Sequence, residues 1–355
     1  MSVNEDLQDR AIRHALALQR YSKGLSDRIV RLLNSADKEL IEKLAARLAA
    51  IDERGIDNGP KTTKRIKEML SEISAINSAI FASIHDTLEG ELTDFADAEA
   101  RGQQKALEKA IVVNVATKLP SPRRIAAIAS QTPIQGILLK PWVEGMGKAR
   151  IERIEQQVRL GLLEGEGTDA IVRRIRGTRA AKYRDGILDK SRRSTQALVR
   201  TATTQVSNVA MQETWKANSN LIKGWEFMAT LDSRTTVTCA GLSGQVFPIG
   251  EGPMPPRHVN CRSISVPVTK SFRELGLDRD ELTPAQRASM DGQVPGDTTF
   301  KDWLERKGEA TQNEVLGPER AAIFRSGKLN LDQFIKNDGS VLTLDELKRL
   351  YPSLG

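Results

Sequence analysis

An apolar stripe runs through the first third of the chain, from Ile66 to Phe95. Apolar side chains recur there every three or four residues, at Ile66, Leu70, Ile73, Ile76, Ile80, Ile84, Leu88, Leu92 and Phe95. This spacing places all of them on one face of an α-helix. A helix from Thr62 to about residue 116 would be roughly 80 Å long. Such a helix cannot bury its stripe alone, so we expect partner helices in an ordinary bundle or, as the alternative, a second subunit.

The segments around this helix are also predicted to be mainly helical. The other expected helices lie at about 6–51 (as two amphipathic stretches), 147–163 and 191–218, with short helices from 281 onward. Gly90 and Gly102 are positions where the long helix could bend or end. Two prolines within 119–122 predict a hinge there.

A different pattern, with β-branched residues between turns, occurs near residues 221–268. Strands are predicted at 221–230, 235–239 and 264–268, with a further turn and strand within 241–247 and a loop rich in Pro and Gly at 248–258. The expected fold class is therefore mainly α with a small β element (α+β). We expect an elongated N-terminal helical region followed by a compact core. The predicted domain ranges are 1–119 for the helical region, 120–270 for the core and 271–355 for a C-terminal helical tail.

The composition excludes several classes of protein. Aromatic residues make up only 4% of the chain, which suits long helices better than a large β-sandwich. No run of about 20 apolar residues is present, so we expect no transmembrane helix and no membrane partner. The first ten residues, MSVNEDLQDR, are polar and acidic and do not resemble a secretory signal. Without a transmembrane helix or a secretory signal, we expect a soluble protein that folds in a cytosol. The two cysteines, Cys239 and Cys261, exclude a scaffold held by several disulfides.

Positive charge is concentrated in one short segment, residues 173–193. It contains nine basic and two acidic residues, a net charge of +7 that equals the formal charge of the whole chain. The candidate DNA-binding residues are Arg173, Arg174, Arg176, Arg179, Lys182, Arg184, Arg192 and Arg193. Only Tyr183 interrupts the segment as an aromatic, so we expect contact with the phosphates of double-stranded DNA, without sequence specificity. Alternatively, the arginines pair with an acidic protein surface or with nearby acids such as Glu164, Glu166 and Asp169.

Cys239, His258 and Cys261 are the set of side chains that could bind a soft metal ion. Thiolates and imidazole are preferred ligands of Zn²⁺, and His258 and Cys261 have the spacing of half a zinc knuckle. A closed structural site needs four ligands, so Asp232 or a water would have to complete this one. The alternative is two buried thiols and a hydrogen-bonded histidine that hold a Pro-rich loop. A lasting disulfide is less favoured in a cytosolic protein.

A catalytic role for the polar residues around this set is the weaker interpretation. The sequence has no nucleophile elbow, phosphate loop or paired-carboxylate pattern, and His14 and His85 are distant in sequence from His258. We expect a structural role for the polar residues of this region, which are Arg200, Asn208, Asp232 and Arg234. In this interpretation Asp232 caps a tight turn, while Arg200 and Asn208 tie a helix to the β element.

Short motifs follow one another in a recognisable order between about residues 135 and 350. They are GLLEG at 161–165, Arg176-Gly177, Arg200-Thr201, Asn208, Trp225, LDSRT at 231–235, Cys239, PPRHVNCR at 255–262, FKDWL at 300–304, EVLGP at 314–318 and LTLDEL at 342–347. This order resembles the Mu F-like minor head proteins of tailed bacteriophages, a head-morphogenesis family. One departure is Ser263, where the family often has a further cysteine.

The resemblance implies a structural minor head protein, not an enzyme, with a Mu F-like core. It implies action at the portal vertex during head assembly and DNA packaging, first in the host cytoplasm and then in the virion. Its implied partners are the portal protein, the major capsid or scaffold protein, and packaged DNA. Two alternatives remain. One is a metal-dependent, nuclease-like enzyme that uses His258 and its neighbours, and the other is an internal DNA-binding protein ejected into the host.

Overall fold

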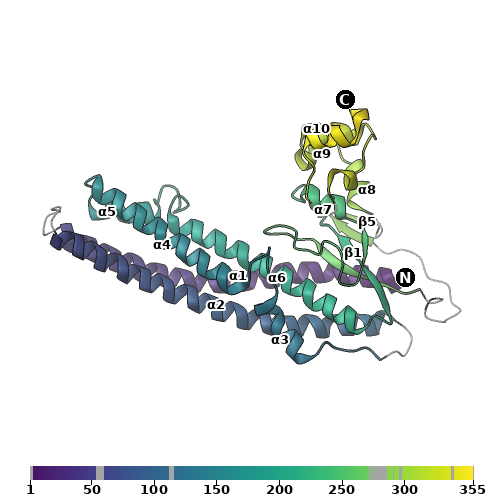
Figure 1. Ribbon diagram of the computed structural model, residues 1–355, viewed down its shortest axis with the longest axis horizontal. Helices are drawn as coiled ribbons and strands as arrows, with labels where there is room; N and C mark the ends of the chain where they lie inside the picture. Colours follow the sequence, from purple (N-terminus) through teal and green to yellow (C-terminus); the bar gives the residue numbers. More distant parts are fainter. Residues whose placement is uncertain are drawn as a thin grey trace. The chain divides into compact units, whose positions relative to one another are not determined.

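A computed structural model of the chain describes residues 3–52, 60–111, 116–271, 274, 286–290, 292–295, 298–336 and 340–354. Long helices dominate it, and a small antiparallel sheet accompanies them (Figure 1). The predicted fold class, mainly α with a small β element, is confirmed. None of the helices in these ranges is long and apolar enough to span a membrane.

Helices and strands occupy separate parts of the chain, with long helices first, most strands next and short helices last. The helices of the first two thirds are α1 (Val3–Asp52), α2 (Pro60–Ala110), α3 (Pro122–Gln131), α4 (Leu139–Leu163), α5 (Thr168–Arg176) and α6 (Ile187–Ala217). The elements that follow are β1 (Ile222–Met228), α7 (Val237–Leu242), β2 (Val246–Pro248), β3 (Ile264–Thr269), β4 (Gln286–Ser289) and β5 (Gly292–Pro295). The C-terminal elements are α8 (Phe300–Glu305), α9 (Glu309–Leu316), α10 (Pro318–Arg325), η1 (Leu331–Phe334), α11 (Leu344–Leu350) and η2 (Pro352–Leu354).

The chain packs as two compact units, each assembled from segments far apart in sequence. Unit 1 contains residues 1–20, 94–128 and 203–355, and unit 2 contains residues 21–93 and 129–202. Helices α1, α2 and α6 each contribute to both units. The domain ranges predicted from the sequence, 1–119, 120–270 and 271–355, are contiguous, whereas each of these units combines separate segments. The predicted ranges remain a prediction.

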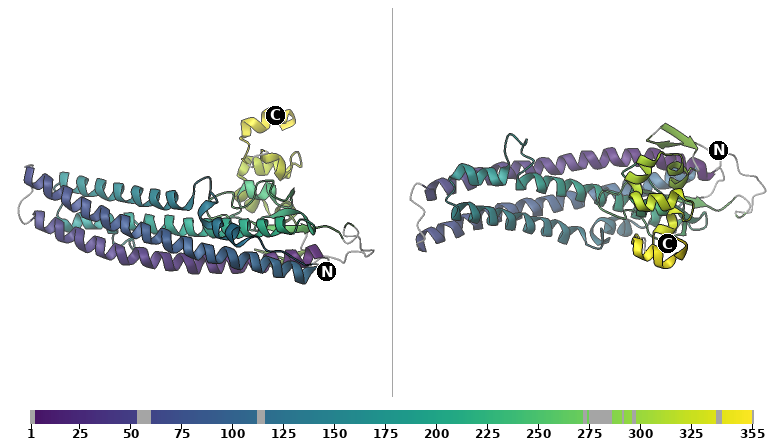
Figure 2. Two further views of the ribbon diagram at one scale, coloured as in Figure 1. Left: turned by 60° about the horizontal axis from the view of Figure 1, so that its bottom comes forward. Right: turned by 90° about the horizontal axis from the view of Figure 1, so that it is seen from above.

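Unit 2 is a helical bundle whose core contains the first part of the apolar stripe. Helices α1, α2, α4 and α6 run side by side in it, and α5 packs with them (Figure 2). The core residues are Leu40, Leu44, Leu48, Ile51, Met69, Leu70, Ile73, Ile154, Val158, Ile171, Ile175, Ile187 and Leu188. The first part of the stripe of α2 is therefore buried against helices of the same chain, as expected for an ordinary bundle.

A close approach between α2 and α4 depends on a glycine. A Cβ atom on Gly147 would lie 2.9 Å from the Phe81 ring, a distance that real Cβ atoms do not tolerate. The backbone oxygen of Gly147 also accepts a 2.9 Å hydrogen bond from Nδ2 of Asn77, which is buried on α2. A glycine at position 147 thus allows the two helices to pack and their polar groups to pair.

Unit 1 is built around a three-stranded antiparallel sheet with the order β2-β1-β3. Trp225 and Phe227 of β1 are fully buried in one core with Trp215 of α6 and the apolar side chains of α7 to α11. Met228, Ile264 and Val266 form a second cluster, against which the first turns of α1 pack. The sheet is thus covered by helical segments drawn from both ends of the chain.

Four predictions of helices and strands were wrong in detail. Residues 6–51 form one continuous helix, and α2 continues through both Gly90 and Gly102. A Cβ at either glycine would meet nothing within 4 Å, so these are exposed positions where glycine costs only about 1 kcal/mol. Cooperative packing of the long stripe outweighs that cost.

The predicted strand at 235–239 is instead the start of helix α7. Its β-branched residues favour a strand, but the Thr236 side chain accepts a hydrogen bond from the Cys239 backbone N–H and caps the helix. A hairpin of β4 and β5 lies where short helices were expected. The predicted strands at 221–230 and 264–268 correspond to β1 and β3, and the turn and strand expected within 241–247 corresponds to the end of α7 and the start of β2.

Candidate metal centre and basic surface

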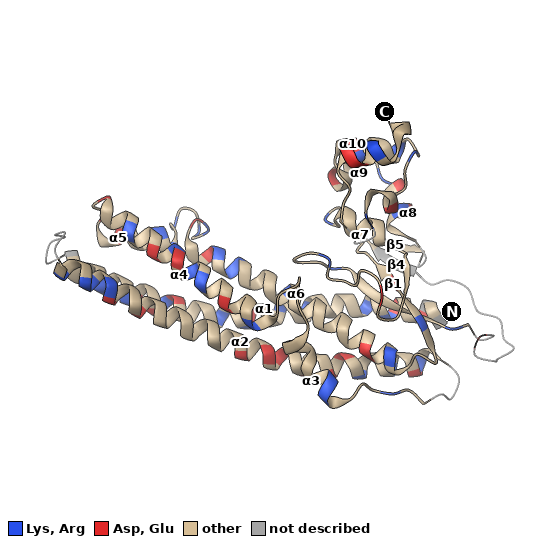
Figure 3. Cartoon of the chain, viewed as in Figure 1, with Lys and Arg blue, Asp and Glu red and all other residues tan. Residues whose placement is uncertain are grey.

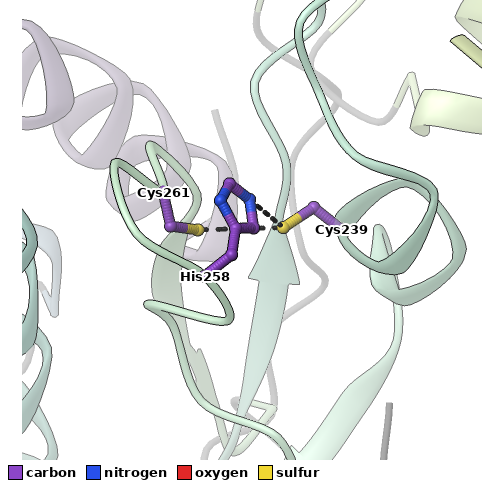
Figure 4. A group of neighbouring side chains, drawn as sticks. All are labelled: Cys239, His258 and Cys261. Carbon is purple, nitrogen blue, oxygen red and sulfur yellow. Dashed lines mark hydrogen bonds between the residues drawn. The ribbon is translucent and has the colours of Figure 1, made fainter. Parts of the chain in front are cut away.

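Cys239, His258 and Cys261 come together in unit 1, as the sequence predicted. One ligand atom from each lies within 4.8 Å of the others (Figure 4). Sγ of Cys239 is 3.5 Å from Nε2 of His258 and 3.7 Å from Sγ of Cys261. Both cysteines are free and buried, and His258 is partly exposed. Cys239 belongs to α7, whereas His258 and Cys261 belong to the loop before β3.

Local turns orient the histidine and the second cysteine. Nδ1 of His258 lies 2.9 Å from the backbone oxygen of Val259, which only accepts hydrogen bonds. Nδ1 therefore carries a proton, and Nε2 faces the Cys239 sulfur. Asn260 adopts a left-handed conformation with φ of 62°, which asparagine tolerates better than most residues. The turn closes when the Cys261 N–H donates to the His258 backbone oxygen at 3.1 Å.

The electrostatics favour a thiolate on Cys261. A hydrogen bond from Cys239 lowers the pKa of Cys261 well below its ordinary value, and His258 lowers it further despite burial. The pKa of Cys239 is raised by its hydrogen bond to Cys261 and by burial. The pKa of His258 is raised, chiefly by its hydrogen bond to Cys261. Cys261 therefore loses its proton more readily than Cys239, and the thiolate is the form of cysteine that binds metal ions.

Asp232 does not complete this ligand set. Its carboxylate is held by the Arg262 guanidinium, with Nη2 donating to Oδ1 at 2.8 Å and Nη1 to Oδ2. Burial alone would raise the pKa of Asp232, but the hydrogen bonds and charge of Arg262 outweigh it, and the pKa lies below its ordinary value. The expectation that Asp232 could be a fourth ligand is corrected. Ser263 is buried and interacts with the Cys239 thiol, which lowers the pKa of Cys239 slightly against the larger effects that raise it.

The turn-capping role of Asp232 and the anchoring role of Asn208 agree with the contacts. Oδ1 of Asp232 accepts a 3.0 Å hydrogen bond from the backbone N–H of Arg234, whose side chain is exposed. Asn208 on α6 accepts from the Ser265 N–H of β3 at 3.1 Å through Oδ1. Arg200 falls in unit 2, and its predicted tie to the β element stays a prediction.

Arg262 is the residue of this region that the sequence interpretation missed. Arg262 lies in the loop that carries His258 and Cys261, and its guanidinium binds the Asp232 carboxylate. This ion pair joins the turn after β1 to the loop before β3. Its place directly after Cys261 in the PPRHVNCR motif was the available signal. Carboxylates with two guanidinium hydrogen bonds are a common structural device.

The other histidines lie in different surroundings. Nε2 of His14 lies 2.9 Å from Oε2 of Glu99, which also accepts a 2.5 Å hydrogen bond from Ser207. His85 contacts Asp86 and Glu89 on the surface of α2. The nuclease-like alternative needs a second histidine beside His258, and these two are engaged elsewhere.

The basic segment spans the end of α5, its connection to α6 and the first turns of α6 (Figure 3). Asp185 closes the connection by accepting from the Thr178 N–H at 2.8 Å and from the Thr178 hydroxyl at 2.7 Å. Gly177 has φ of 94°, and a Cβ there would collide with Asp185. Hydrogen bonds between Thr178 and Asp185 therefore hold the backbone of the connection in one conformation, and its basic side chains extend from this turn.

The structure separates the paired from the unpaired basic residues of this segment. Arg174 binds Glu164 and Glu166, Arg192 binds Asp37, and Arg193 binds Asp189. The guanidinium carbon of Arg176 lies 5.6 Å from the centre of the Tyr183 ring. Six basic residues are exposed and form no ion pair with any residue that the structure describes; they are Arg173, Arg176, Arg179, Lys182, Arg184 and Lys190.

Comparison with known proteins identifies the segment that holds both features. Residues 152–266, about a third of the chain, match the family of the phage Mu protein F like protein. Over this segment the chain is similar to Mu F-like phage proteins. The match includes the basic segment, the Cys239–His258–Cys261 cluster and the Asp232–Arg262 pair. The match supports a phage head-morphogenesis protein. No curated protein and no solved structure gives a significant match.

Proposed function

We propose that this Mu F-like protein is a minor head protein that acts at the portal vertex and contacts DNA during packaging. The observation that supports the proposal is the position of the exposed, unpaired basic residues inside the matched segment 152–266. Excess positive charge on a closed turn repels itself, and neutralisation by DNA phosphates relieves that repulsion. Since the stripe of α2 is buried within the chain, contacts with other head proteins must use other surfaces.

Incorporation into procapsids is expected to require the portal. Procapsids would be assembled from the phage's capsid and scaffold proteins with the tagged full-length chain, with and without portal protein. We expect a low, fixed copy number in the portal-containing particles and no protein in those without portal. Quantitative immunoblotting of gradient-purified particles measures both. Equal incorporation without portal would contradict the portal-vertex role and leave the family assignment intact.

We further infer that Cys239, His258 and Cys261 bind one zinc ion that stabilises unit 1. The donor set fits the ion: two sulfur atoms and an imidazole nitrogen lie within 4.8 Å of one another, the pKa of the Cys261 thiol is lowered, and Nδ1 of His258 is held by the Val259 backbone oxygen. The ion would join α7 to the loop before β3. In this proposal the three residues have a structural role, with no catalytic step.

Zinc removal is expected to lower the stability of the protein. At free zinc about 100 times its dissociation constant, the bound ion contributes about 2.7 kcal/mol, which a chelator abolishes. Cys261→Ser should lose the metal, whereas Ser263→Cys should supply a fourth thiolate and bind zinc more tightly. Elemental analysis and thermal melts with and without chelator measure these effects. A metal-free wild-type protein from zinc-supplemented medium would favour the buried-thiol alternative.

A further inference from the structure

The two sulfur atoms of the candidate metal centre are also placed to react with each other. Cys239 and Cys261 are the only two cysteines of the chain, and both are free thiols. Their Sγ atoms lie 3.7 Å apart, with no other side chain between them in Figure 4. A disulfide needs a shorter separation, which rotation of the two side chains about their Cα–Cβ bonds supplies.

The backbones of the two cysteines are held by contacts that do not involve the sulfur atoms. The N–H of Cys239 donates to the Thr236 hydroxyl oxygen at 3.4 Å, at the start of α7. The N–H of Cys261 donates to the His258 backbone oxygen at 3.1 Å, and its own backbone oxygen accepts from the Thr204 hydroxyl at 3.4 Å. The pair is therefore kept in place by the fold itself, whether or not a metal ion is bound.

The pair lies just beneath the surface of unit 1. Cys239 is 1% exposed and Cys261 is 2% exposed, whereas His258, which contacts Cys239, is partly exposed. The next two residues of the loop, Val259 and Asn260, are exposed. A bulky disulfide such as oxidised glutathione must bring its own sulfur atom into line with the attacking one, which this cover prevents. Hydrogen peroxide is a much smaller oxidant and needs only a local opening of the loop.

We propose that Cys239 and Cys261 form an intramolecular disulfide when the protein meets a peroxide. In the first step one thiol attacks hydrogen peroxide, the O–O bond breaks, and a sulfenic acid and one water form. In the second step the other thiol attacks the sulfenic sulfur, the S–S bond forms, and the hydroxyl group leaves with the thiol proton as a second water. Two thiols are thus oxidised by two electrons, and one peroxide is reduced to two waters.

The disulfide changes what the centre can bind and keeps what it joins. Disulfide sulfur atoms are not thiolates, so the oxidised pair no longer binds Zn²⁺. The new bond links α7 to the loop before β3, the same two segments that the ion would join. A head protein leaves the reducing cytosol when the particle is released, so a join that survives oxidation fits the proposed function. The loss of zinc rests on the proposed metal centre, whereas the disulfide does not.

Thiol counting in the full-length protein tests the disulfide directly. Metal-free protein would be treated with hydrogen peroxide, quenched with catalase, denatured and alkylated. We expect both thiols to disappear together, with Cys239 and Cys261 in one linked peptide of a monomeric chain, and a reductant to restore both. No other intramolecular pairing is available to a chain with two cysteines. Thiols that stay reduced, sulfinic acids without a link, or disulfide-linked dimers would each overturn the proposal.

Zinc uptake by the same samples separates this inference from the metal centre. We expect the reduced protein to bind zinc, and the oxidised protein to bind none until a reductant is added. If the reduced protein binds no zinc but still forms the disulfide, the metal centre fails and the disulfide stands. If the reduced protein binds zinc and peroxide does not link the cysteines after the metal is removed, the disulfide fails and the metal centre stands.

Two single variants and a second oxidant complete the test. Cys239→Ser and Cys261→Ser each keep one thiol, so neither can form the internal link. After peroxide treatment, the wild-type protein should melt at a higher temperature than either treated variant, because only its α7 stays joined to the loop. A wild-type protein that melts no higher than the variants would contradict the join. Oxidised glutathione at the same concentration should leave the thiols of the folded protein reduced, and oxidation as fast as that by peroxide would overturn the assignment to a small oxidant.

Discussion

Replacing Asp37 by Asn is expected to destabilise the protein by about 3 to 5 kcal/mol, because it leaves a buried guanidinium without its counter-charge. Asp37 and Arg150 are almost fully buried, and the Asp37 carboxylate is shared with Arg192. Asparagine keeps the size and one acceptor oxygen but removes the negative charge. The two arginines would then face each other across a neutral amide. Denaturant unfolding followed by circular dichroism measures the loss.

An exposed ion pair of the same bundle is the control. Glu72 on α2 binds Arg47 on α1, and both side chains are solvent-accessible, with 39% and 52% of their surface exposed. Water screens such pairs, so Glu72→Gln should change stability far less than Asp37→Asn does. Both substitutions remove one negative charge from an interhelical pair and differ in burial. If both variants lose the same free energy of unfolding, the burial of Asp37 and Arg150 does not explain how much their ion pair contributes to stability.

The stripe of α2 shows why the helices could be predicted from the sequence. Its period of three to four residues needs no tertiary information, since a 3.6-residue repeat has one consistent apolar face. What the period does not reveal is which neighbour covers that face. The covering helices α4 and α6 lie far along the chain, and a contact such as Asn77 with Gly147 depends on their packing.

The candidate site was predicted in its parts and not in its connections. Cys239, His258 and Cys261 were identified because soft ligands are few in this chain, and the fold brings them together. The segment around Cys239 was wrongly predicted as a strand. It forms helix α7, because the Thr236 side chain caps the helix by accepting a hydrogen bond from the Cys239 N–H. The ion pair of Asp232 with Arg262 joins residues 30 positions apart, and no local pattern encodes such a contact.

The basic segment illustrates the same limit for charge. The sequence counts nine basic residues but does not separate those that are neutralised within the fold. Arg174 and Arg192 are bound by acids of unit 2, two of which, Glu164 and Glu166, were weighed from the sequence as partners. Pairing with acids is therefore correct for part of the segment. The remaining exposed residues define a smaller surface on which the DNA proposal can be tested.

Removing four unpaired arginines is expected to reduce DNA affinity and its salt dependence together. The variant replaces Arg173, Arg176, Arg179 and Arg184 by Gln, all exposed and without ion pairs among the residues described. Each phosphate contact contributes about 0.9 to the slope of log K against log salt, so the slope should become shallower by up to about 3 to 4 units. All duplex sequences should weaken alike, since phosphates carry no sequence information. Fluorescence anisotropy over a salt series measures the slope.

Two controls separate phosphate contact from a general effect of charge. Arg174→Gln should leave the slope unchanged, because Arg174 is held by Glu164 and Glu166, and it should cost stability instead. A second quadruple variant replaces Lys43, Lys105, Lys148 and Arg306, which are exposed elsewhere in the chain, and carries the same change in net charge. If DNA binding depends on the basic segment, only the first quadruple variant makes the slope shallower. Equal slopes for the two quadruple variants would mean that DNA responds to the total charge of the protein and not to this surface.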